Sequence, residues 1–144
     1  MDSLHEISVS ASPSKVFDAW TTKQGLEAWW TARVVVPRAP GEHYVFGFDG
    51  GNVEFHFRAV EEVAGVRIRW TGIAGPKMPA EWIDTEIDVR LSARNDGGTR
   101  MQFGHKNWRS IDGGYCICNT TWGELMYRLR DFCEGRPRGP LFAS

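Results

Sequence analysis

The chain has 144 residues, of which 42% are hydrophobic and 24% are charged, and its formal net charge is -1. That length suits a single domain spanning residues 1–144 with a substantial buried core. The near-zero charge argues against a nucleic-acid partner, which needs clustered lysine and arginine, and no apolar run approaches the roughly 20 residues of a membrane span.

The cysteines and the N-terminus bear on the compartment. Residues 1–6 contain neither a basic segment nor an apolar one, and the cysteine count of three is odd. Both features predict reduced thiols and a cytoplasmic location. Cys116 and Cys118 would point about 200° apart on a helix, so we expect no shared metal ion. Motifs for phosphate or dinucleotide binding are absent from the sequence, and we expect no cofactor.

The N-terminal part predicts one strand and two short helices. Residues 6–9 alternate between polar and apolar side chains, which indicates a strand. Ser12 followed by Pro13 predicts a capped helix start. Thr21, with Gln24 three residues later, predicts the cap of a second helix.

From about residue 34 the apolar period changes to two residues, which is typical of strands. Strands are predicted near residues 44–48, 53–59, 66–70, 83–91 and 99–105. In the second of these, Ala59 shares the inward face with Phe55 and Phe57. Glycine and proline are too dense over residues 72–80 for regular structure.

The last predicted element is a helix from about Asp112 to Gly135. Its apolar residues recur at about 100° per residue and form one stripe. Gly135 is a typical helix stop. The element order predicts an α+β domain in which a curved antiparallel sheet folds around the C-terminal helix, with a pocket between them.

Both ends of the chain resemble a known family. The segment 13–22, PSKVFDAWTT, is followed by an apolar group comprising Leu26, Trp29 and Trp30. The closing residues are Trp122, Leu125, Leu129, Phe132 and Gly135, then GPLF at 139–142. This pattern resembles bacterial proteins related to the activator of the heat-shock-protein-90 ATPase, within the START-like (SRPBCC) superfamily.

The resemblance implies a helix-grip fold with a cavity between sheet and helix. Cavities of this superfamily bind lipids, hormones, polyketides and aromatic compounds. The family has no universal catalytic motif, so the resemblance assigns no catalytic residue. It also admits a homodimer and a chaperone partner.

The alternation of faces along the strands and the apolar stripe of the helix suggest which residues form the wall of this cavity. The residues expected to face inward are Phe55, Phe57, Trp70, Ile87, Met101, Phe103, Trp122 and Met126. Trp29 and Trp30 are expected to form part of a lid, and His105 is the expected uncharged polar anchor. The same rings could instead fill the interior, and the sequence leaves both arrangements open.

The expected function is binding of a small apolar, aromatic or lipid-like ligand. One alternative is a polyketide cyclase-like or hydrolase-like enzyme that uses the same cavity. Another is a chaperone cofactor that acts through its surface. His105 is the one inward ionisable side chain that parity identifies, so the sequence favours binding over catalysis.

Overall fold

The computed structural model describes residues 2–75, 77–110 and 114–143, and within them seven strands form one antiparallel sheet. The strands are β1 (Ser3–Val9), β2 (Arg33–Val35), β3 (Tyr44–Phe48), β4 (Val53–Val63), β5 (Arg67–Ile73), β6 (Glu86–Ala93) and β7 (Thr99–Lys106). Their order in the sheet is β1-β7-β6-β5-β4-β3-β2. Each pairing of neighbours in this order is antiparallel, as predicted for the sheet.

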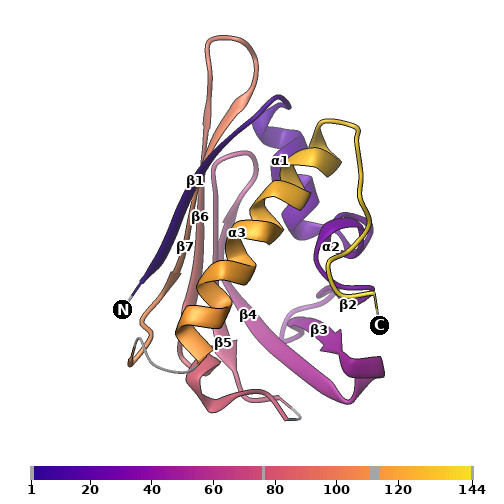
Figure 1. Ribbon diagram of the computed structural model, residues 1–144, viewed down its shortest axis with the longest axis vertical. Coiled ribbons are helices and arrows are strands. Elements are labelled where there is room, and N and C mark those ends of the chain that lie inside the picture. The colour runs from indigo at the N-terminus through magenta and orange to yellow at the C-terminus, as the bar shows by residue number, and fades with distance from the viewer. Residues whose placement is uncertain (1, 76, 111–113, 144) are drawn as a thin grey trace.

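Helix α3 (Gly114–Cys133) crosses the concave side of this sheet, as Figure 1 shows. Helices α1 (Pro13–Thr21) and α2 (Lys23–Trp29) pack against α3. This arrangement confirms the helix-grip fold. No helix in the described part of the chain is long and apolar enough to cross a membrane.

The first two helices begin at hydroxyl caps. The Ser12 hydroxyl accepts a hydrogen bond from the Lys15 amide at 3.2 Å, as predicted. The cap of α2 was predicted one residue too early. Thr22 accepts from the Gly25 amide at 3.0 Å, because Thr21 still belongs to α1 and donates to the Phe17 carbonyl.

Helix α3 buries the predicted stripe. Its buried apolar residues are Trp122, Leu125, Met126, Leu129 and Cys133. Gly135 follows with φ of 84°, a left-handed conformation that glycine adopts without a Cβ clash. The predicted start at Asp112 lies outside the described residues.

The strand predicted from residue 83 begins later than expected. Strand β6 starts at Glu86, because Asp84 has φ of 69° and interrupts the extended backbone. The 3-10 turn η2 (Ala80–Trp82) precedes this point. Two backbone hydrogen bonds of 2.9 Å still join Gly72 to Asp84 and Thr85, so this segment stays attached to β5.

Ala59 shares the face of Phe57, as predicted, but it is exposed. The register of β4 against β5 is continuous from Phe57, opposite Gly72, to Ala59, opposite Trp70. The register shifts only after Ala59, before Glu61, and an extra residue in one strand breaks the alternation of faces. The alternation of two residues therefore holds up to Ala59 and fails beyond it.

Asp88 of β6 is a charged residue, yet its side chain is only 2% exposed. Arg67 donates two hydrogen bonds to its carboxylate, at 3.2 and 3.0 Å, and Lys106 donates a third at 2.9 Å. Burial alone would raise the pKa of Asp88, but these cationic donors outweigh it and hold the pKa below its usual range. The carboxylate therefore joins β5, β6 and β7 on the outer face of the sheet.

Candidate functional site

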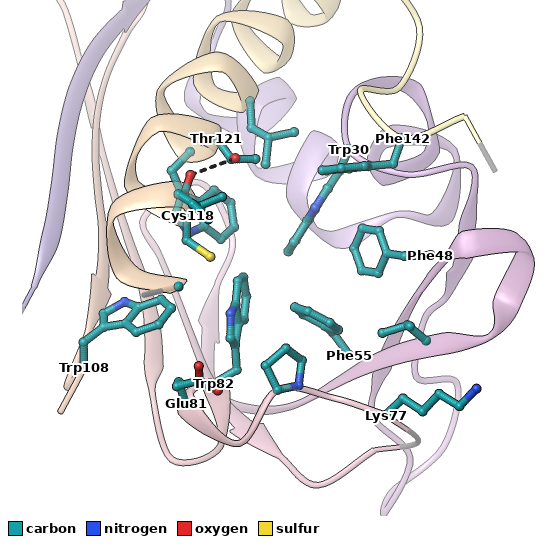
Figure 2. Close-up of a pocket in the computed structure, with 16 residues that line it drawn as sticks. Trp30, Phe48, Phe55, Lys77, Glu81, Trp82, Trp108, Cys118, Thr121 and Phe142 are labelled. Carbon is teal, nitrogen blue, oxygen red and sulfur yellow. Dashed lines mark hydrogen bonds between the residues drawn. The ribbon is translucent and has the colours of Figure 1, made fainter. Parts of the chain in front are cut away.

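A cavity of about 460 Å³ lies where the first turns of α3 face the β3–β4 hairpin and the loop before β6. Figure 2 shows the side chains around it. The lining residues are Trp30, Phe48, Val53, Phe55, Lys77, Pro79, Glu81, Trp82, Trp108, Gly114, Ile117, Cys118, Thr121, Trp122, Leu125 and Phe142. Seven of these sixteen residues are aromatic, and volume and lining are both typical of small-molecule sites.

The β3–β4 hairpin supplies one wall. Phe48 ends β3 and pairs with Val53, which begins β4, so the hairpin turn carries both to the cavity. The rings of Phe48 and Phe55 meet edge to face with centroids 5.0 Å apart. Edge-to-face contacts hold rings in defined positions, and this wall is thereby fixed before any ligand arrives.

Trp82 continues this wall toward α3. The turn η2 presents it from the glycine- and proline-rich loop between β5 and β6. Its ring centroid is 4.6 Å from that of Phe55, 5.8 Å from Trp108 and 6.2 Å from Trp122. It therefore links the hairpin wall to α3.

Trp82 and Trp108 line the cavity but were not among the site residues predicted from the sequence. Both lie outside the strands, in segments where no period assigns a face to a side chain. A signal was present, because large apolar side chains in otherwise polar or glycine-rich loops are unusual, and loops often carry binding sites.

The structure separates the predicted wall into two groups. Trp30, Phe55 and Trp122 line the cavity. The others lie in the core, away from it: Trp29, Phe57, Trp70, Ile87, Met101, Phe103, His105 and Met126. These eight side chains are buried, and none of them is among the residues that line the cavity.

Trp29, Met101 and Trp70 take part in indole hydrogen bonds that fix the core. Trp29 donates to the Ala19 carbonyl at 2.9 Å, which ties α2 to α1. Met101 accepts from Trp20 through its sulfur at 3.3 Å. Trp70 donates to the Glu62 carboxylate at 2.9 Å. Their polar atoms are thus occupied within the fold.

His105 is bonded on both sides of its ring. The Trp122 indole only donates, so Nδ1 of His105 accepts its hydrogen bond at 3.0 Å. Nε2 then carries the hydrogen and donates to the Thr85 hydroxyl at 2.8 Å, which donates onward to the Trp82 carbonyl. Burial lowers the pKa of His105 to about 3. The ring is a neutral structural bridge between β7 and α3.

Few polar groups face the cavity. Burial raises the pKa of the Cys118 thiol, although a hydrogen bond from Trp82 acts in the opposite direction. The Thr121 hydroxyl donates to the Ile117 carbonyl at 2.9 Å, the dashed line in Figure 2. Lys77 and Glu81 are the charged residues of the lining, and both are exposed. The interior therefore suits an apolar ligand, with charge only at its rim.

Comparison with known proteins agrees with this geometry. The family profile described as "Activator of Hsp90 ATPase homolog 1-like protein" matches residues 10–134. A search of curated proteins finds no match.

Solved structures share the fold. The solution structure of the Aha1 dimer from Colwellia psychrerythraea has 29% identity and a TM-score of 0.83, over 94% of this chain and 98% of that one. Protein MLL2253 from Mesorhizobium loti has 16% identity and a TM-score of 0.79, over 93% and 97%. CalU16 from Micromonospora echinospora has 19% identity and a TM-score of 0.68, over 94% and 76%. The last two similarities bear on the fold alone.

Proposed function

Because this chain belongs to the Activator of Hsp90 ATPase homolog 1-like family, whose relatives include START-like (SRPBCC) proteins, we propose that its cavity binds a small apolar ligand that contains rings. The observation that carries the proposal is the void of about 460 Å³ with seven aromatic side chains around it. A core that rings fill completely leaves no such volume.

The wall favours aromatic ligands over flexible chains. Offset and edge-to-face ring pairs contribute about 0.5–1.5 kcal/mol beyond the burial of their area. Phe48, Phe55 and Trp82 contact one another edge to face and together present ring faces and edges to the cavity. A flat ligand against this wall gains ring contacts, which an alkyl chain does not.

The test fills the cavity with a bulky side chain introduced on α3 and compares it with the same substitution at a neighbouring position outside the cavity. Thr121 lines the cavity, whereas its neighbour Thr120 is exposed and does not. The apolar probe N-phenyl-1-naphthylamine should bind at one per chain in the unmodified protein and in Thr120→Trp. Thr121→Trp should abolish binding while its unfolding transition stays cooperative.

Native mass spectrometry of the purified protein adds an independent readout, since a retained small molecule would identify the ligand directly. Equal probe binding by Thr121→Trp and Thr120→Trp would place the ligand elsewhere. Absence of any probe or retained molecule from the unmodified protein would refute the ligand-binding function.

Self-association is a second candidate function, which the relative from Colwellia psychrerythraea favours because it is described as an Aha1 dimer. The β4–β5 hairpin exposes Val60, Val63 and Val66 by 49%, 45% and 53%. Exposed apolar side chains in one place are typical of protein interfaces. We propose this hairpin as the dimer contact.

Sedimentation velocity tests the dimer. The unmodified chain should sediment as a dimer at high concentration, and the double variant Val63→Glu/Val66→Glu should sediment as a monomer with an unchanged circular dichroism spectrum.

A chaperone partner, which the family description suggests, is tested by adding the chain to a purified Hsp90-type chaperone. The expected result is faster ATP hydrolysis, and an unchanged rate would contradict it.

A further inference from the structure

Residues 135–143 form a strap that returns from the end of α3 to the cavity. Figure 1 shows it in yellow, running down beside α2 to the region of β2. Its Phe142 forms a parallel bridge with Thr31, just after α2. The bridge places the Phe142 ring in the cavity wall, edge to face with Phe48 at a centroid distance of 5.1 Å.

Backbone hydrogen bonds attach the strap at its far end. The Ala32 amide donates to the Phe142 carbonyl at 2.9 Å, and the Phe142 amide donates to the Trp30 carbonyl at 3.0 Å. A longer bond of 3.4 Å runs from the Leu141 amide to the Trp29 carbonyl. This is a short ladder compared with the continuous pairing of the sheet strands.

Side chains of α3 and of the strap itself hold its middle. Arg128 donates from its guanidinium to the Gly139 carbonyl at 2.9 Å. Arg138 forms an ion pair with Asp131 at 3.0 Å. Gly139 has φ of 82°, a left-handed conformation next to this attachment. The strap can therefore pivot at Gly139 once the Arg128 bond opens.

The strap is attached less firmly than the hairpin wall it faces. Phe142 is half-buried, as are Phe48 and Phe55 of that wall. Phe48 and Phe55 lie in continuously paired strands, but residues 141–142 have only the short ladder to residues 29–32. Segments with few hydrogen bonds open first in native proteins, so Phe142 is on a segment that opens at a lower cost than the hairpin wall.

We propose that this strap is the gate of the cavity. It opens about Gly139 to admit and release ligand, and in the closed state the Phe142 ring limits the size of ligand that fits. This inference rests on the proposed ligand-binding function. It adds the route of entry and the residue that determines ligand size.

Stopped-flow binding of naphthalene, followed by tryptophan fluorescence, tests the gate. Arg128→Met removes the bond to Gly139, together with the pair that Arg128 forms with Glu124, without changing the cavity lining. Both association and dissociation should become about tenfold faster, as expected for loss of one charge-assisted hydrogen bond to the strap. Arg100→Met is the matched control. Arg100 pairs with Glu6 at 2.8 Å between β7 and β1, and no hydrogen bond or ion pair joins either residue to the described strap residues, so the rates should not change.

Ligand size is tested with pyrene, which has four fused rings against the two of naphthalene. Phe142→Ala should bind pyrene and lose affinity for naphthalene, while the unmodified chain should prefer naphthalene. If naphthalene binds but neither Arg128→Met nor Phe142→Ala changes rates or size preference, the gate is wrong and the ligand-binding function stands. If the unmodified chain binds neither compound, the ligand-binding function itself fails and the gate with it.

Discussion

His105 illustrates how tertiary contacts decide the role of a single residue. Its parity indicates an inward side chain, and the structure places it inside, but with both nitrogens bonded to Trp122 and Thr85. Burial lowers the pKa of His105 to about 3. As the pH falls, the unfolded chain therefore takes up a proton on this residue near pH 6.5, whereas the folded chain does so only near pH 3. Its contribution to stability is therefore present above pH 6.5 and is lost as pH falls toward 3.

We expect His105→Gln to be less stable than the unmodified chain at pH 7, because a buried hydrogen-bonded bridge is disturbed. The difference in free energy of unfolding between the two proteins should narrow by about 1.4 kcal/mol per pH unit below 6.5, since the variant lacks the titrating group. Urea unfolding at pH 7, 5.5 and 4.5 measures the gap. A gap that stays constant over this range would mean that His105 is protonated in the folded protein.

At the scale of elements, α3 is held by its buried stripe and not by its exposed face. Leu129 is fully buried, so Leu129→Ala should lower the free energy of unfolding by about 2–5 kcal/mol. Tyr127 is 51% exposed, and the Arg130 guanidinium lies over its ring. Tyr127→Ala should therefore change the free energy of unfolding by about 0.5 kcal/mol or less. Denaturant titration compares the two variants. Similar losses in both would show that α3 is not packed by this stripe.

At the scale of the whole molecule, the thiols report how the fold opens. Cys133 ends α3 inside the core, and burial raises the pKa of its thiol to about 12. Cys116 is exposed. In the native protein Ellman's reagent should modify Cys116 rapidly and Cys133 only when α3 leaves the sheet.

Labelling of Cys133 should therefore follow stability. If Leu129→Ala removes about 3 kcal/mol, Cys133 should react about a hundredfold faster, because each 1.4 kcal/mol is a factor of ten. Cys116 should react at the same rate in both proteins. Mass spectrometry of timed samples separates the two sites, and rapid modification of Cys133 in the unmodified protein would contradict the packing described for the helix end.

The sequence by itself determined most of the elements and their order. The period-two strands, the Ser12 cap before Pro13 and the apolar stripe of α3 depend on neighbours within a few residues. The resemblance of both chain ends indicated the family and the helix-grip fold, and the local patterns agree with it, because a one-sided sheet and a one-sided helix have few ways to cover each other. The errors were local as well: the cap at Thr21, the start of the strand at residue 83, and the short strand β2, which was not predicted.

Only the tertiary structure decided which inward side chains meet a void. Parity assigns a face to Phe55 and to Phe57 alike, yet the first lines the cavity and the second lies in the core. The difference depends on Trp82, Trp108 and Phe142, which reach the site from segments without any period. Packing is set by distances between segments far apart in the chain, and a local pattern carries no information about those distances.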